Sequence, residues 1–133
     1  KYHNKFSCYI GFDDELAHLI EAGSDIFLMP SKYEPCGLNQ MYSLMYGTVP
    51  VVRHTGGLAD TVQAYNPKNK TGNGFVFKKY SASEMLTEIK NAVKIFTKDQ
   101  DKWQNIMRNG MKSDFTWMNS TKKYVDLYKK LTD

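Results

Sequence analysis

The sequence is poor in the residues that build disulfide frameworks and metal sites. Its 133 residues include two cysteines, Cys8 and Cys36, which form no CxxC pair, and three histidines without the spacing of metal ligands. Two cysteines cannot staple a domain of this size, so we expect a reduced, intracellular protein. For the same reason of spacing we expect no metal site.

Long hydrophobic runs are also missing. A membrane-spanning helix needs about 20 mainly apolar residues, and no run in this chain comes near that length. The chain opens with a polar stretch, residues 1–5, instead of a signal peptide, and it lacks an initiator Met. We therefore expect a cytoplasmic protein without a membrane partner, and a chain that is a piece of a longer one.

Positive charge is concentrated late in the chain, but no arginine cluster accompanies it. Residues 1–77 carry six positive and seven negative side chains, whereas residues 78–133 carry twelve and seven, and most of the excess is lysine. Lysines spread along helices usually face solvent. Since no aromatic side chains interleave with them as on a nucleic-acid-binding surface, we expect no nucleic-acid partner.

What remains is the composition of a globular domain. Hydrophobic residues make up 41% of the chain and aromatic residues 14%, while the net charge is only +4. Such a chain can build a core and is not expected to be disordered. Its length suits a single domain over residues 1–133, and a two-domain enzyme with a closed cleft is hard to fit.

Short β-like runs alternate with amphipathic segments, which indicates an α/β fold. The predicted strands begin at residues 6, 26, 49 and 75, and their spacing suits right-handed crossovers in a parallel sheet. We predict a Rossmann-like parallel sheet flanked by helices. The last helix, from about Asn119, has an apolar stripe that we expect to pack in the core. The strands cover Phe6–Gly11, Ile26–Met29, Val49–Val52 and Phe75–Phe77.

The end of the second predicted strand carries the strongest local signal for a binding site. Ligands of such sheets bind beyond the carboxyl ends of the strands. A helix is predicted to begin near Gly37, where the amides of Gly37, Leu38 and Asn39 would form an anion site. Glu34 would repel a phosphate there, so its carboxylate would face the hydroxyl groups of a sugar. Alternatively, Glu34 only stabilises the helix dipole.

Two other strand ends carry weaker signals. Phe12 follows the first predicted strand, where its ring either stacks on a flat ligand or tucks into the core. Thr55, Gly56 and Gly57 precede a short predicted helix and form either a second anion-binding turn or simply a tight turn. The segment is neither a Walker loop nor a G-x-G-x-x-G motif.

Two sequence blocks resemble the bacterial glycogen synthase and plant starch synthase family. Residues 30–40 read Pro-Ser-Lys-Tyr-Glu-Pro-Cys-Gly-Leu-Asn-Gln and are similar to the family motif Pro-Ser-x-Phe-Glu-Pro-Cys-Gly-Leu-x-Gln. Residues 46–62, with Thr-Gly-Gly-Leu-Ala-Asp-Thr-Val at their end, are similar to the next family block almost residue for residue. Residues 74–77 and 114–117 match two later landmarks, so the resemblance covers nearly the whole chain.

The resemblance implies a fold, an activity and a missing partner domain. It implies the C-terminal, donor-binding domain of a GT-B glycosyltransferase, in which two Rossmann-like domains enclose the active site. Such enzymes transfer glucose from ADP-glucose to the non-reducing end of an α-1,4-glucan with retention, and use no metal or cofactor. The acceptor glucan would bind the N-terminal domain, and a basic pair for the diphosphate would lie before Lys1. The isolated chain is therefore expected to be inactive, and its location to be the cytoplasm, or the plastid of a plant.

The resemblance also assigns roles to single positions. Glu34, the candidate catalytic residue, falls on the carboxylate that holds the glucose hydroxyls, and Phe12 on an aromatic residue that stacks on the nucleobase. Related retaining transferases have a second Glu eight residues after the first, but the synthase family generally lacks it, and this chain has Tyr42 there. The remaining donor-binding positions are Cys36, Gly37, Leu38, Asn39, Thr55 and Gly56.

The sequence leaves two other classes of function open. One is a non-catalytic module that binds a nucleotide sugar or a glucan, and the other is a different retaining GT-B transferase. An upstream Lys-x-Gly-Gly-Leu segment in the parent reading frame would favour the synthase. The sequence does not distinguish ADP-glucose from UDP-glucose, because Phe12 would stack on either base; ADP-glucose is the expectation from the family.

Overall fold

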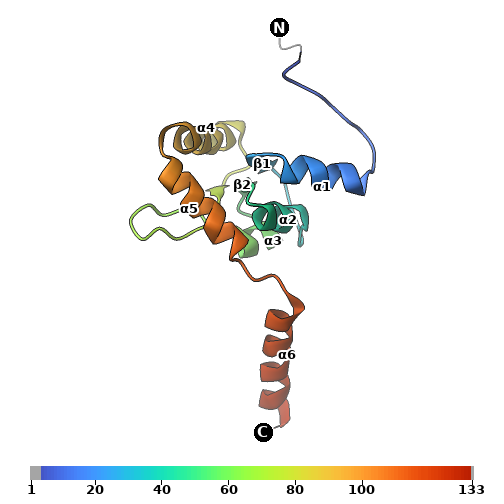
Figure 1. Cartoon of the computed structure of the whole chain (residues 1–133). Coiled ribbons are helices and arrows are strands. Elements are labelled where there is room, and N and C mark those ends of the chain that lie inside the picture. The colour runs from blue at the N-terminus through green and yellow to red at the C-terminus, as the bar shows by residue number, and fades with distance from the viewer. Residues whose placement is uncertain (1–3, 133) are drawn as a thin grey trace.

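Three of the predicted apolar segments form a parallel sheet in the order β1–β2–β3. The computed structural model describes residues 4–132 and contains β1 (Ile26–Met29), β2 (Val49–Arg53) and β3 (Phe75–Phe77). Ile26 lies opposite Val49, and Val51 lies opposite Phe75. The predicted α/β architecture with a Rossmann-like parallel sheet is therefore confirmed (Figure 1).

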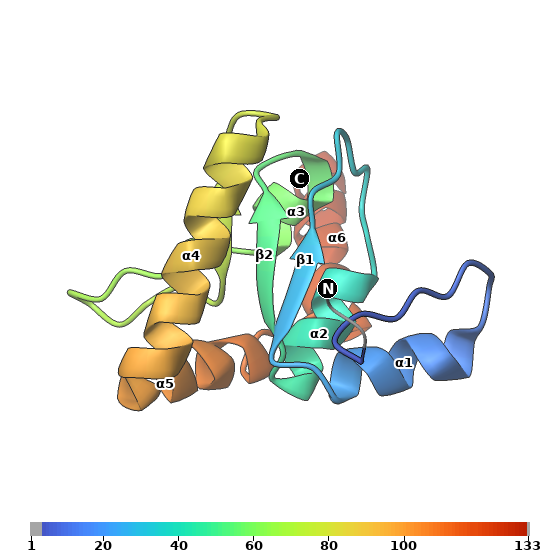
Figure 2. The same cartoon turned by 90° about the horizontal axis from the view of Figure 1, so that it is seen from above.

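Helices cover both faces of the sheet. The central strand β2 directs Val49 and Val51 to a core formed with α4 and α5, and it directs Val52 to a second core formed with α2 and α3. Figure 2 shows α4 on one side of the strands and α2 with α3 on the other. Within the described residues the helices are α1 (Asp14–Ala22), α2 (Asn39–Tyr46), α3 (Gly56–Thr61), α4 (Ala82–Lys98), α5 (Gln100–Met111) and α6 (Trp117–Thr132).

Pro50 lies in the central strand without leaving a gap in the hydrogen-bond ladder. The amide of Val49 donates to the carbonyl of Asp25 at 3.0 Å, on the side of β1. Successive residues of a strand point their backbone groups to alternate sides, so the nitrogen of Pro50 faces the side of β3. The ladder with β3 begins only at Val51, so no donor is needed at Pro50.

The prediction of a strand over Phe6–Gly11 is wrong. This segment forms no strand and runs away from the sheet (Figure 1). The side chains of Phe6 and Ile10 are 81% and 94% exposed. An apolar run becomes a strand only when a neighbouring strand pairs with its backbone groups, and β1 has β2 as its only partner among the described residues.

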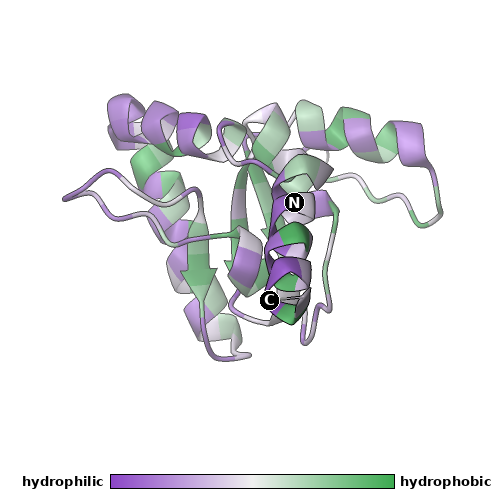
Figure 3. Ribbon diagram, turned by 90° about the horizontal axis from the view of Figure 1, so that it is seen from below, coloured by the Kyte–Doolittle hydropathy of each residue, from purple (hydrophilic) through white to green (hydrophobic). Residues whose placement is uncertain are grey.

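The expected core packing of the last helix is also wrong. No residue of α6 is buried, and Figure 1 shows the helix projecting from the rest of the molecule. Figure 3 shows hydrophobic turns along this helix, which ends at the C-terminus. An amphipathic pattern shows that one helix face is apolar, but it does not say what covers that face.

Candidate functional site

The carboxyl edge of the sheet brings the two strongest sequence blocks together. The loop after β1 (residues 30–38) and the turn after β2 (residues 54–55) lie side by side at this edge (Figure 2). The amide of Gly57 donates to the carbonyl of Glu34 at 2.9 Å and joins them. The predicted site residues between Glu34 and Gly56 therefore belong to one surface.

The two glycines that open α3 allow this close approach. A Cβ atom on Gly56 would lie 1.9 Å from the carbonyl oxygen of Glu34, and one on Gly57 would lie 2.1 Å from the carbonyl oxygen of Cys36. Gly56 also has a positive φ of 45°, which side chains rarely adopt. The glycine pair thus serves the contact between two loops, and Thr55 makes no side-chain cap to α3.

Glu34 has few partners of its own. Its carboxylate is partly buried, and the hydroxyl of Ser31 donates to Oε2 at 3.4 Å. Among residues 4–132, no Lys, Arg or His forms an ion pair with it. A carboxylate in this state keeps acceptor capacity for the hydroxyl groups of a ligand.

The start of α2 presents free backbone amides beside Glu34. Gly37 has a φ of 75°, a left-handed conformation that does not continue a helix, so α2 begins at Asn39, two residues later than predicted. Leu38 is the N-cap and provides no side-chain hydrogen bond. In the described part of the chain, the amides of Leu38 and Asn39 have no acceptor, and both residues are exposed. Helix starts of this kind bind anions.

Gln40 holds the loop in place, a role that the sequence analysis missed. Its side chain is fully buried, and Nε2 donates to the carbonyls of Cys36 at 3.1 Å and Gly37 at 2.9 Å. It also donates to Oγ1 of Thr61 on α3, at 3.2 Å. A polar side chain among the buried positions of an amphipathic helix was the available signal. Cys36 itself has an exposed, free thiol, so its predicted role falls on its backbone.

Phe12 and Asn39 line the same groove between α1 and α2. The groove has a volume of about 220 Å³, and its lining residues also include Glu21 and Tyr42. Phe12 at one end is 95% exposed, so its ring is free to stack and is not tucked into the core. The side-chain amide of Asn39 does not cap the helix start, because its Nδ2 donates to Oε1 of Glu21 at 2.8 Å.

Glu21 is a buried carboxylate that the sequence analysis did not single out. Only 4% of the residue is exposed, although it belongs to a helix with a solvent-facing side. Burial raises the pKa of Glu21 above its ordinary value, while the hydrogen bond from Asn39 and the nearby His18 lower it by less. The burial of Glu21 results from the packing of α1 against α2, which the local sequence does not show.

This raised pKa predicts a pH-dependent gain in stability for Glu21→Gln. The glutamine keeps an oxygen for Asn39 but removes the buried charge. With the folded-state pKa above the unfolded value, stability is lost as the pH rises through the folded pKa. We expect the variant to have a higher free energy of unfolding than the native chain at pH 7, and the difference to vanish below about pH 4.

Urea denaturation at both pH values measures the effect. Glu15→Gln removes an exposed carboxylate from the same helix and serves as the control, with little change at either pH. A Glu21→Gln chain that is less stable than the native one at pH 7 would contradict the prediction.

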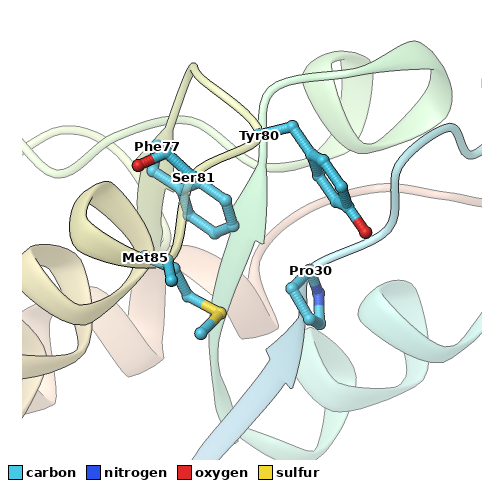
Figure 4. A pocket seen from close by; sticks show the side chains of 6 residues that line it. Pro30, Phe77, Tyr80, Ser81 and Met85 are labelled. Atoms are coloured by element: carbon cyan, nitrogen blue, oxygen red, sulfur yellow. The ribbon is translucent and has the colours of Figure 1, made fainter.

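A second, apolar pocket lies at the same edge of the sheet. It has a volume of about 350 Å³ and is lined by Pro30, Phe77, Tyr80, Ser81, Ala82 and Met85, none of which is charged (Figure 4). The guanidinium of Arg53 lies 5.5 Å from the centre of the Tyr80 ring and donates to the carbonyl of Lys32. Arg53 thus links the loop after β1 to the mouth of this pocket, a contact the sequence did not indicate.

Two kinds of feature are missing from residues 4–132. No group of three or more His, Cys, Asp and Glu side chains is arranged to hold a metal ion. No helix in that range is both long enough and apolar enough for a membrane span.

Comparison with known proteins connects the fold and the site to one family. A family model described as "Glycosyl transferases group 1" matches residues 3–113. The glycogen synthase of Thermotoga petrophila is 55% identical over 130 residues, which are 98% of this chain and 27% of that protein. The glycogen synthase of Petrotoga mobilis is 57% identical over 128 residues, or 96% of this chain and 26% of that protein.

A solved structure matches the fold as well. It is the catalytic domain of starch synthase IV from Arabidopsis thaliana bound to ADP and acarbose, with a TM-score of 0.82 and 35% identity. The match covers 91% of this chain and 25% of that one. The chain thus spans about a quarter of the length of the relatives it matches.

Proposed function

Since this chain belongs to the group 1 glycosyl transferases, we propose that it is the donor-binding domain of a glycogen or starch synthase. The parent enzyme would transfer glucose from ADP-glucose to the non-reducing end of an α-1,4-glucan with retention. The observation that carries the proposal is the start of α2, where Leu38 and Asn39 offer free amides beside the partly buried carboxylate of Glu34. Similar proteins named glycogen synthase, and a starch synthase bound to ADP, support it.

The geometry suggests how the donor lies. The diphosphate would meet the amides of Leu38 and Asn39, which act as fixed dipoles for negative charge. The glucose would lie against Glu34, whose carboxylate accepts from its hydroxyls. The nucleobase would stack on the exposed ring of Phe12. Cys36, Gly37, Thr55 and Gly56 would shape this surface through their backbones.

The chemistry follows from the single carboxylate at this edge. A retaining double displacement uses two carboxyl groups about 5–5.5 Å apart, but the segments that follow the three strands (residues 30–38, 54–55 and 78–81) carry no acidic residue besides Glu34. We therefore propose attack on the same face as the leaving group. The acceptor hydroxyl oxygen bonds to the anomeric carbon, the bond to the diphosphate breaks, and the proton passes to a phosphate oxygen. Glu34 orients the glucose.

The remaining parts of the proposal concern the rest of the parent protein. An N-terminal domain would bind the glucan acceptor and supply the basic side chains that clamp the diphosphate. The absence of a metal or cofactor from the reaction, the cytoplasmic or plastid location, and the inactivity of the isolated chain stay predictions.

Transfer of labelled glucose to glycogen by the full-length protein tests the proposal. We expect incorporation from ADP-glucose into new α-1,4 linkages, with the α configuration of the donor retained. Calorimetric titration should show tighter binding of ADP-glucose than of UDP-glucose. A protein that binds the donor without transfer would be a binding module. Transfer only to an acceptor other than a glucan would indicate another retaining transferase, and either result would overturn the proposal.

A further inference from the structure

A buried carboxylate oxygen in the groove between α1 and α2 lacks a partner. Oε1 of Glu21 accepts from Asn39, but Oε2 is buried and has no hydrogen-bond partner among residues 4–132. Leaving a buried polar atom unpaired is costly. Because Glu21 lines the groove, a ligand that enters it with a hydrogen-bond donor would relieve this cost.

The position of Glu21 limits which part of a ligand can meet it. Glu21 is the eighth residue of α1, so it lies about 10 Å along the helix axis from the first residue, Asp14. Phe12 stands beyond that first residue, at the far end of the groove. Glu21 instead touches Asn39, the first residue of α2, whose amide belongs to the anion site. Glu21 therefore lies at the phosphate end of the groove, about 10 Å along α1 from the first residue of that helix, near which Phe12 stands.

The chemistry of the Glu21 carboxylate further limits which group of the donor can bind to it. A phosphate oxygen would be repelled, because it offers no proton and carries the same charge. An amino group on the nucleobase would lie at the Phe12 end of the groove. The ribose lies between base and diphosphate in a nucleotide sugar, and its two free hydroxyls are hydrogen-bond donors. The bond from such a donor to an ionised acceptor is stronger than a neutral one.

We propose that Oε2 of Glu21 accepts a hydrogen bond from a ribose hydroxyl of the nucleotide-sugar donor, an assignment that rests on the proposed function. Glu21 is then a specificity-determining residue, supplied by α1 from outside the motifs that resemble the family. Asn39 acts as the positioning residue that holds the carboxylate through Oε1. The groove would favour ribonucleotide donors over donors that lack these hydroxyls.

Deoxy analogues of the donor test the proposal on the full-length enzyme. Turnover is measured with ADP-glucose and with its 2′-deoxy and 3′-deoxy ribose analogues, for the native enzyme, Glu21→Ala and Glu21→Gln. We expect the native enzyme to show about 10- to 100-fold lower kcat/KM for at least one analogue. Both variants should lose a similar factor with ADP-glucose, mainly through KM, and should no longer distinguish that analogue. Glu15→Gln, which removes an exposed carboxylate from the same helix, should discriminate against the analogue as the native enzyme does.

Each failure has a distinct reading. A native enzyme that does not use ADP-glucose at all contradicts the proposed function. An active native enzyme that accepts both analogues equally well, or variants that keep the discrimination, overturns the role of Glu21. Circular dichroism identifies a variant that does not fold; if Glu21→Ala fails this check, Glu21→Gln decides, because it keeps the bond to Asn39. If neither variant folds, the analogue series on the native enzyme decides.

Discussion

Replacement of Glu34 by alanine in the full-length enzyme is expected to lower kcat about 100-fold or more, while the domain stays folded. In the proposed binding mode the carboxylate holds the glucose ring beside the anion site, and a misplaced sugar would lose alignment with the acceptor. The loss of stability should be small, because among residues 4–132 the side chain takes part in only one long hydrogen bond, from Ser31. Steady-state kinetics and the melting temperature together measure this result.

A matched substitution separates a catalytic effect from a general one. Glu15→Ala also removes a carboxylate, but from an exposed position on α1, and it should leave kcat within about twofold. If Glu34→Ala retained near-native kcat, Glu34 would lose its assigned role, and the anion site would have to act without a carboxylate beside it.

Gly57→Ala is expected to have the largest effect on the structure of the site. The added methyl group would lie 2.1 Å from the carbonyl oxygen of Cys36 and 2.6 Å from its Cα, so backbone would have to move. The movement would break the bond between the Gly57 amide and the Glu34 carbonyl. We expect the free energy of unfolding to fall by about 3 kcal/mol and transfer activity of the full-length enzyme to be lost.

Gly23→Ala is the control for the loss of a glycine. Gly23 follows α1 with an ordinary φ of −91°, and an added Cβ would meet only the Leu19 carbonyl oxygen, at 3.1 Å. This variant should keep nearly native stability and activity. Equal stability of Gly57→Ala and Gly23→Ala in urea denaturation would show that the two loops do not depend on their close contact.

The sequence predicted the elements whose signal is local. The strands β1, β2 and β3 appear within one residue of their predicted bounds, because a continuous apolar run indicates a strand buried on both faces. Asp13 and Ser81 cap α1 and α4 through hydrogen bonds from the backbone amides of Leu16 and Glu84, which is also a local interaction. The strand over residues 6–11 and the core packing of α6 failed, because each needed a partner that the local pattern does not identify.

The site residues also fall into those that local sequence predicted and those that it did not. The sequence placed Glu34 and Leu38 at the carboxyl edge of the sheet, where the structure has them, because both follow an apolar run that forms β1. The buried roles of Glu21 and of Gln40, the last residue of the motif at residues 30–40, were not predicted, because they depend on contacts between packed segments. A glutamate on an amphipathic helix looks like an ordinary surface residue until its neighbours are known.

By itself the sequence determined the fold class, the family and the loop that opens α2, because apolar runs, glycines and motif residues act within a few positions of one another. Only the tertiary structure decided that the glycine pair of α3 packs on the backbone of that loop. It also decided that the carboxylate of Glu21 on α1 is buried with one oxygen that has no hydrogen-bond partner among residues 4–132. Contact and burial depend on how segments meet in space, and the cost of an unpaired buried charge exists only after they have met.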